Sequence, residues 1–378
     1  MRTRVTEMLG IDFPVFAFTH CRDVVAAVTN AGGCGVLGAV AHSPEQLDVD
    51  LAWIKEQTKG RPFGVDLLIP RKYAGAEAGG LPPGSLQAML PEEHRRFLDD
   101  LLARYDVPPL PPPSSGEERG TRIMAVDPKR MAPLIDVSFA HGIALIASAL
   151  GTPPDWLVAR AHAAGVPVAA LAGRIDHAVA HKAAGVDVII AQGTEGGGHT
   201  GEIATMVLVP QVVDAVAPTP VLAAGGIATG RQMAAALALG AEGVWCGSVW
   251  LTTPEAETSP VIKEKFLAAT SADTRRSRSL TGKPARMLRS PWTDAWEESG
   301  APAPLPMPLQ SLLVAEPQRR IHRVAHKEGT GARDLVTYFV GQVVGQMNEV
   351  KPARRVVSDM IAEFVDTMER LQGLLETD

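Results

Sequence analysis

The chain has 378 residues, of which 46% are hydrophobic and 5% aromatic, and its formal net charge at pH 7 is −6. This length exceeds that of an average domain, but it also suits one large α/β barrel with additions. The negative charge predicts no general attraction to nucleic acid or to an anionic membrane.

Cysteine usage and the N-terminal segment indicate the compartment of the protein and whether it binds a metal. The three cysteines, Cys21, Cys34 and Cys246, are too few and too unpatterned for a disulfide framework or a zinc site, so we expect no metal. The first residues contain no signal-peptide core, and no run approaches the roughly 18 apolar residues of a membrane helix. These observations predict a cytoplasmic protein.

Eight short apolar runs are distributed along the chain. Continuous apolar runs of this length indicate strands that are buried on both faces, as in a parallel sheet. The expected strands cover residues 13–18, 35–39, 63–69, 144–150, 166–172, 186–193, 220–226 and 243–248.

Alanine-rich helical patterns lie between most of these runs. The phrases HAAGVPV, HKAAGVDV and ALALGAEGV each join a helix end, a glycine and a strand start, which is typical of a βα unit. Eight strands in this alternation predict an α/β fold, a (β/α)8 TIM barrel. A doubly wound open sheet competes with it, because alternation alone does not separate the two folds. Helices are expected over 22–31, 44–57, 154–164, 176–184, 204–216 and 230–239.

Two stretches interrupt this alternation. Residues 70–135 hold Pro/Gly-rich segments around a helical piece near 86–104, which indicates an insertion after the third strand that acts as a loop or lid. A second excursion contains a helix near 258–269 and the proline-rich APAPLPMPLQ. We expect a barrel over 1–250 with the insertion 70–135, a small substrate or lid domain over 251–330, and helices near 331–348 and 352–375 within 331–378 that pack on the barrel and offer surfaces for a homodimer.

Glycine-rich turns follow the seventh and eighth expected strands, as AAGGIATG and CGSVW. Backbone N–H groups in such turns, aided by a helix N-terminus, bind phosphate groups. Gly225, Gly226, Gly247 and Ser248 therefore predict a phosphate site, of a substrate or of a cofactor; the alternative is that these glycines only make tight turns.

The sixth strand ends in AQGTEGGGHTG, residues 191–201. Three consecutive glycines lose much conformational freedom on folding, so something must approach their backbone closely. We interpret this approach as that of a flat ligand, an FMN ring, beside the phosphate site. His199 would then be an acid or base next to the ring, since its ordinary pKa suits proton transfer near neutrality.

Three segments together, AQGTEGGGHTG, PVLAAGGIATGRQMAAALALGAEGVWCGS and TGKPARMLRS, resemble the nitronate monooxygenase family, whose pattern is shared by flavin-dependent enoyl-ACP reductases and an NADH:quinone reductase. The opening FPVFAFTHCRDVVAAVTNAGGCGVLGA is similar to the family's first βαβ unit, and GQVVG resembles its C-terminal GQ segment. The resemblance covers most of the chain outside 70–135 and parts of 290–330. It implies an FMN-bound barrel with a small extra domain.

The resemblance also implies roles for individual residues. It makes His199 the catalytic acid/base and places Asp66 where the family usually has Asn. Ser148 ends the fourth expected strand, and its side chain either faces the flavin or is turned away from it. The resemblance implies contacts of Ala17, Phe18, Asp66, Gln192, Gly193 and Gly198 with the ring, and of Gly225, Gly226, Gly247 and Ser248 with the phosphate. To these cofactor-binding residues we add Ser148, Gly197 and Ala224 as predictions.

The sequence departs from the family at the end of the first strand, where FAFTHC replaces a Pro-Met pair. Phe18, Thr19, His20 and Cys21 either reshape access for the substrate, or Cys21 is a small buried hydrophobe. A basic cluster lies in the second excursion and either neutralises an anionic substrate, a CoA phosphate or a nicotinamide dinucleotide, or forms a solvated face. Its members are Arg275, Arg276, Arg278, Lys283, Arg286 and Arg289.

These features predict an FMN-dependent oxidoreductase that oxidises a small carbon acid or alkyl nitronate with O2. One alternative is an NAD(P)H-dependent reductase of quinones or enoyl thioesters, without a Rossmann fingerprint after the first strand. Another class is a flavin-free barrel isomerase or aldolase with a phosphorylated substrate. A regulatory flavin-binding protein with little turnover is the last alternative.

Overall fold

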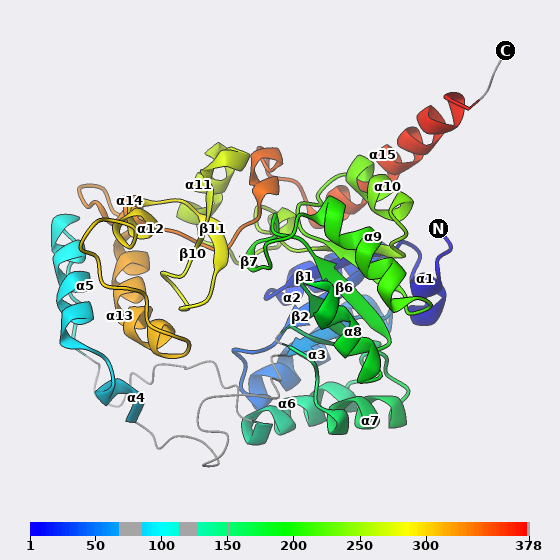
Figure 1. The fold of residues 1–378 in the computed structure, drawn as a ribbon, viewed down its shortest axis with the longest axis horizontal. Coiled ribbons are helices and arrows are strands. Elements are labelled where there is room, and N and C mark those ends of the chain that lie inside the picture. Colours follow the sequence, from blue (N-terminus) through cyan, green and yellow to red (C-terminus); the bar gives the residue numbers. More distant parts are fainter. Residues whose placement is uncertain (68–84, 113–127, 150, 376–378) are drawn as a thin grey trace.

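Eight parallel strands close into a barrel in this computed structural model, which describes residues 1–67, 85–112, 128–149 and 151–375 (Figure 1). The last barrel strand pairs with the first, so the predicted (β/α)8 fold is confirmed and the open sheet is excluded. The barrel strands are β1 (Val15–Thr19), β2 (Cys34–Gly38), β3 (Gly64–Leu67), β4 (Leu145–Ser148), β5 (Val168–Ala172), β6 (Val188–Gln192), β8 (Val221–Ala224) and β9 (Gly243–Cys246).

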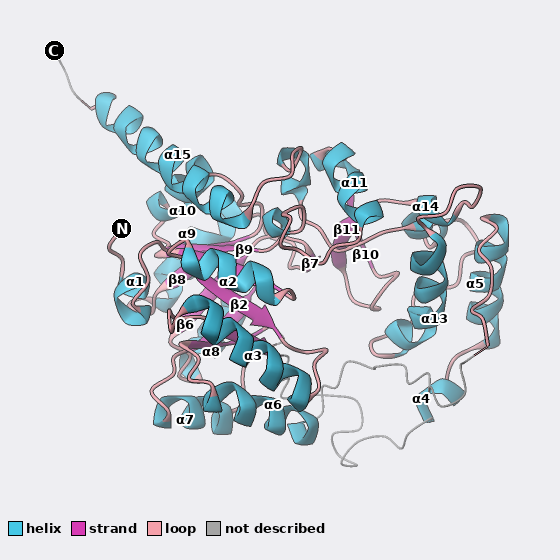
Figure 2. Cartoon of the chain, turned by 180° about the vertical axis from the view of Figure 1, so that it is seen from behind, coloured by secondary structure: helices cyan, strands magenta, loops and turns pink. Residues whose placement is uncertain are grey.

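Helices surround this barrel, as the alternation predicts (Figure 2). A capping box at Ser43 starts α3, whose first residue is a proline, and another at Thr229 starts α10. The surrounding helices are α2 (Arg22–Asn30), α3 (Pro44–Thr58), α6 (Pro128–Ala140), α7 (Asp155–Ala163), α8 (Ile175–Ala183), α9 (Thr205–Val216) and α10 (Gly230–Ala238).

The barrel interior is closed at its amino end. Helix α1 (Arg4–Leu9) contributes Val5 and Leu9 to the same apolar cluster as the inward-facing side chains Phe16, Leu145 and Ile190. Helix α1 does not cover the carboxyl end of the barrel, which is where the active sites of this fold lie.

A second apolar core joins two parts of the chain that are far apart in sequence. Leu98 and Leu102 of α5 pack with Phe266, Trp292 and Ile321. Figure 1 shows the helices of this second unit beside the barrel, with a three-stranded antiparallel sheet, β10-β11-β7, between them. The elements of this unit are α4 (Ser85–Ala88), α5 (Glu92–Arg104), α11 (Pro260–Ala268), β10 (Thr274–Ser277), β11 (Ala285–Leu288), α12 (Pro291–Ala295), α13 (Leu309–Val324) and α14 (Ala332–Leu335).

Three expectations about these elements need correction. Residues 128–135 belong to the excursion expected over 70–135, yet they form the first part of the barrel helix α6, which packs on α3. Residues 70–84 and 113–127 of that excursion lie outside the described residues. Helix α13 was not predicted, since prolines surround its start and Pro317 lies within it. The helix expected over 331–348 is only α14 and the short η4 (Gln342–Gln346), because the segment between them is extended and Phe339 bridges to Met287 of β11.

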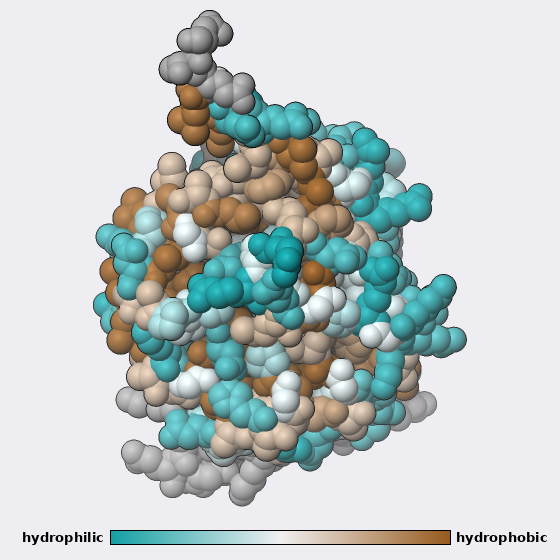
Figure 3. Space-filling model, turned by 90° about the vertical axis from the view of Figure 1, so that its right-hand side faces the viewer, coloured by the Kyte–Doolittle hydropathy of each residue, from teal (hydrophilic) through white to brown (hydrophobic). Residues whose placement is uncertain are grey.

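The final helix, α15 (Ala353–Gly373), begins on the barrel and ends away from it. Val356, Val357 and Met360 are buried in the barrel core, while Met368 and Leu371 are exposed. Figure 3 shows this end standing above the body of the molecule. No helix in the described part of the chain combines the length and the apolar character that crossing a membrane requires.

Candidate active site

Four of the predicted site residues lie on the inner face at the carboxyl ends of the barrel strands. Side chains alternate along a strand, and Phe16, Ile190 and Leu222 point into the barrel. Phe18, Gln192 and Ala224 are two residues further along the same strands, so they share that face, as Asp66 does on β3 two residues after the inward Gly64.

Two predicted residues lie on the opposite face. Ala17 follows Val15 in the core between strands and helices, and Ser148 follows Ile146 of that core, whereas Leu145 and Ala147 point inward. The side chains of Ala17 and Ser148 are therefore turned away from the barrel interior. Trp245, which stacks on Phe16 and Phe18, is an inner-face residue that the sequence reasoning missed.

Asp66 is an unusual carboxyl group for a barrel interior. It is 3% exposed, and no atom of the described residues makes a hydrogen bond with its Oδ2. Burial raises the pKa of Asp66 to about 8, because the charged form loses its hydration without gaining a counter-charge. The group is therefore mainly protonated at neutral pH and has a hydrogen bond to offer at the barrel mouth.

The glycine turns pack on one another and on the rest of the chain. A Cβ atom on Gly225 would lie 2.8 Å from the carbonyl oxygen of Gly193, and one on Gly197 would lie 2.8 Å from the backbone nitrogen of Gly341. Glu195 joins the turns, since its carboxylate accepts hydrogen bonds from the backbone nitrogen and the hydroxyl of Thr205. The atoms that come close to these glycines thus belong largely to the protein's own backbone.

Two glycines of the predicted set face open space instead. A Cβ atom on Gly198 would meet no atom within 4 Å, although its φ of +75° favours glycine, and the nearest atom to one on Gly247 would be 3.9 Å away in Phe18. Gly225 and Gly226 border a cavity of about 320 Å³ that extends along α9 and α10, where Met206 and Leu239 line it. The open space at Gly198 and Gly247 is what leaves room for a ligand at the carboxyl ends of the barrel strands.

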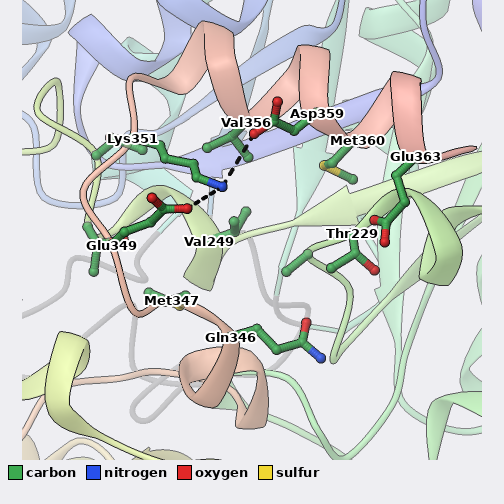
Figure 4. Close-up of a pocket in the computed structure, with 13 residues that line it drawn as sticks. Thr229, Val249, Gln346, Met347, Glu349, Lys351, Val356, Asp359, Met360 and Glu363 are labelled. Carbon is green, nitrogen blue, oxygen red and sulfur yellow. Dashed lines mark ion pairs between the residues drawn. The ribbon is translucent and has the colours of Figure 1, made fainter.

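The N-terminus of α10 is already capped by the protein. The backbone nitrogen of Gly230 donates to Glu363 Oε2 at 2.8 Å, so this donor of α10 is not free for a phosphate. Figure 4 shows Glu363 and Thr229 in the second cavity, beside the ion pairs of Lys351 with Glu349 and Asp359. None of the predicted site residues lines this second cavity.

His199 lies in a short strand that the sequence did not reveal. Strand β7 (Gly198–His199) pairs antiparallel with β11, with His199 opposite Ala285. Its Nε2 lies 2.9 Å from Oγ1 of Thr281, and the ring of Phe339 is 6.4 Å away between centroids. Burial and, secondarily, the charge of Lys283 lower the pKa of His199 to about 4, so its imidazole is neutral at physiological pH.

Most of the predicted basic cluster is engaged within the protein. Arg275 and Arg289 pair with Asp294, both at 3.0 Å, and the other three arginines donate to backbone carbonyl groups. Lys283 is exposed, and the described residues give it no ion-pair partner. Arg278 is exposed as well and has no ion pair within the described residues, but Lys283 is the cation of the cluster whose charge acts on His199.

One group of potential metal ligands lies elsewhere. Ligand atoms of Cys21, Asp23 and Glu257 are all within 4.8 Å of one another. The Cys21 thiol donates a hydrogen bond to the carbonyl of Glu255 at 2.9 Å, and burial raises its pKa, so the thiolate that a metal would need is disfavoured.

Comparison with known proteins decides the family. The family model described as nitronate monooxygenase matches residues 2–363. The chain belongs to the nitronate monooxygenase family. It is 64% identical over 376 residues, with 100% coverage of each chain, to the Mycobacterium tuberculosis protein named "Putative monooxygenase Rv1533". It is 27% identical to a Staphylococcus aureus protein named "Probable nitronate monooxygenase", covering 97% of this chain and 99% of that one.

Solved structures agree with this membership. Nitroalkane oxidase from Streptomyces ansochromogenes has a TM-score of 0.77 at 27% identity, covering 97% of this chain and 99% of that one. FabK from Thermotoga maritima has a TM-score of 0.72 at 29% identity, covering 99% of each chain. The protein is thus an oxidoreductase of the nitronate monooxygenase family, whose members typically depend on a flavin.

The residues at the barrel mouth fit a flavin. The orphaned Asp66 Oδ2 offers a buried hydrogen bond on the inner face, as the polar edge of a flavin ring requires. The space at Gly247 adjoins Ser248, whose Oγ accepts a hydrogen bond from the Gly341 nitrogen and keeps its own proton to donate to an anion.

Proposed function

We propose that this protein binds FMN and oxidises small anionic alkyl nitronates with O2, with His199 as the acid/base group beside the substrate. The observation that carries the proposal is a neutral imidazole that feels the charge of the exposed Lys283, beside the glycine turns of the barrel mouth. When bound, FMN supplies the electron transfer from the substrate to O2.

Residues of the barrel mouth would hold the cofactor in two places. Gly226, Gly247 and Ser248 would bind the phosphate through backbone N–H groups and the Ser248 hydroxyl, without help from the capped α10. The flavin ring would lie on the inner-face residues Phe18, Asp66, Gln192 and Ala224. Beside the ring would be the glycine run with Gly193, Gly197 and Gly198, while Gly225 would belong to the turn that binds the phosphate. We assign no side-chain contact to Ala17 or Ser148, since both side chains face the helices.

The state of His199 favours a nitronate over a neutral nitroalkane. A nitronate is already deprotonated at carbon, so it needs no strong base, and its negative charge is attracted by Lys283. A neutral nitroalkane must lose a proton, and a group with a pKa of about 4 is a weak base for that step. With a nitronate, His199 therefore serves to orient the bound anion, whose charge lies toward Lys283, and it takes up a proton only from a substrate that is still a carbon acid.

An NAD(P)H-dependent reductase of quinones or enoyl thioesters is the second candidate. It is supported by the similarity to FabK from Thermotoga maritima. The arginines that would bind the phosphates of CoA or a dinucleotide are engaged with Asp294 and with backbone carbonyls, so we rank this function below nitronate oxidation.

Anaerobic reduction of the purified holoprotein separates these functions. We expect flavin absorbance, rapid bleaching by an alkyl nitronate, slow bleaching by the matching neutral nitroalkane, and none by NADH or NADPH. Rapid bleaching by a nicotinamide dinucleotide would establish the reductase. A colourless protein that takes up no FMN would leave the flavin-free isomerase or aldolase as the remaining enzyme class.

A further inference from the structure

The hairpin between β10 and β11 places a threonine against the candidate catalytic histidine. His199 is opposite Ala285 in the β7–β11 pair, and Thr281 precedes that strand at the hairpin's turn. Oγ1 of Thr281 lies 2.9 Å from Nε2 of His199 and is buried, with the residue 8% exposed. Eighty-two positions separate these two residues in the sequence.

The Thr281 hydroxyl has one proton and two lone pairs, and the structure shows a partner for each. Its proton points to the carbonyl oxygen of Lys283 at 3.1 Å. One lone pair faces the backbone nitrogen of Lys283 at 3.4 Å, and the other faces His199 Nε2. A hydroxyl that donates to the Lys283 carbonyl accepts from Nε2, and in this arrangement Nε2 carries the hydrogen.

The other ring nitrogen of His199 is in a different situation. Nδ1 makes no hydrogen bond within the described ranges, and it is absent from the set of buried, unpartnered atoms that includes Nδ1 of His42 and His94. A neutral imidazole with hydrogen on Nε2 therefore presents a bare lone pair at Nδ1 to the accessible side of the site.

We propose that Thr281 is a positioning residue that holds His199 as the Nε2–H tautomer, so that Nδ1 is the atom that accepts a proton or hydrogen bond from the substrate. The role of Nδ1 toward the substrate rests on the proposed function, whereas the tautomer of His199 does not. When the substrate is a neutral carbon acid, its α proton goes to Nδ1, the imidazolium keeps its Nε2–H bond to Thr281, and the proton then leaves Nδ1 to solvent; a nitronate, already deprotonated, skips this transfer. The opposite tautomer, with the Thr281 hydroxyl donating to Nε2, would leave the Lys283 carbonyl without that hydrogen.

Nitrogen-15 NMR of histidine-labelled protein tests the tautomer directly. His199→Gln assigns the signals, and spectra are compared near pH 7.5 for the wild type, Thr281→Val and Thr281→Ser. We expect a protonated, pyrrole-like Nε2 and a bare, pyridine-like Nδ1 in the wild type and in Thr281→Ser, and a mixture in Thr281→Val. A wild type with hydrogen on Nδ1, or an unchanged tautomer in Thr281→Val, would overturn the proposal.

Kinetics supply the second measurement. Loss of one hydrogen bond is expected to lower kcat about 10-fold in Thr281→Val, with KM little changed and recovery in Thr281→Ser. Flavin content and thermal melting show whether each variant is folded. The tautomer signals do not depend on turnover, so an enzyme that fails to oxidise nitronates would contradict the proposed function and leave the NMR result to decide the role of Thr281.

Discussion

The backbone nitrogen of Gly230 donates a 2.8 Å hydrogen bond to Glu363 Oε2, and the other oxygen of that carboxylate pairs with Arg231 at 2.6 Å. A helix near the C-terminus thus caps the helix that follows the phosphate turn of the barrel. Because α15 is held here, it contributes to the stability of a site to which its own residues do not belong.

Glu363→Ala should lower the free energy of unfolding by about 1 kcal/mol, since it removes a cap from the first turn of α10. Urea titration followed by circular dichroism measures this. Glu369→Ala removes an exposed carboxylate from the same helix and should be nearly neutral. Equal stability losses in the two variants would show that the cap contributes nothing.

Asp66→Asn should change how stability depends on pH in the flavin-free protein. The folded chain binds this proton more tightly than the unfolded chain, so wild-type stability should fall as pH rises from about 4 to about 8. The full effect of such a shift is on the order of 5 kcal/mol. The free energy of unfolding should therefore be measured at pH 5 and at pH 8.5 for both proteins. The variant should gain stability relative to the wild type at the higher pH. An equal difference at both pH values would contradict the raised pKa.

The barrel can be predicted from the sequence because local patterns determine its strands and turns. Apolar runs, helix caps and glycines at helix ends locate all eight barrel strands and the carboxyl-end turns. Strand periodicity also separates Asp66, on the inner face, from Ser148, on the outer one, once the register is known. The family motifs locate the glycine turns and His199 in the same way.

Long-range pairing accounts for what the sequence does not reveal. Strand β7 has two residues and exists only because β11 pairs with it, so no local pattern marks it. The contact of Thr281 with His199 and the ion pairs of Arg275 and Arg289 with Asp294 depend on the same second unit. A cluster of arginines looks like an anion site until the structure shows its partners.

Gly197→Ala and Gly198→Ala should differ in their effects. A Cβ atom at Gly197 would press on the backbone of Val340 and Gly341, which cannot rotate away, so this loop must shift. Gly198 has open space but a φ of +75°, which costs about 1 kcal/mol for alanine. Thermal melting and flavin content should therefore be affected more in Gly197→Ala; the reverse order would mean that the 340–341 segment yields easily.

Lys283→Met should weaken the enzyme toward anionic substrates and shift its pH profile. KM for a nitronate should rise, and its dependence on ionic strength should fall, because this cation is lost. The pKa of His199 should move upward from about 4, so the acidic limb of kcat/KM moves to higher pH. Arg289→Met, which removes a cation paired with Asp294, is the matched control. Equal changes in both variants would point to a general effect of net charge.

His199→Ala or His199→Asn should reduce oxidation of a neutral carbon acid on the order of 10²–10⁴-fold if the imidazole takes up the α proton of the substrate. The side chain contacts Thr281 and the ring of Phe339 and lies in a two-residue strand, so its loss should leave the barrel folded and the flavin bound. Asparagine tests the role more sharply than alanine, because it can donate to Thr281 and cannot take up a proton at neutral pH. Stopped-flow flavin reduction gives the chemical step, and flavin absorbance confirms cofactor content. Near-wild-type reduction in the asparagine variant would assign His199 to hydrogen bonding alone, and the oxidation would then proceed without an acid/base group at this position.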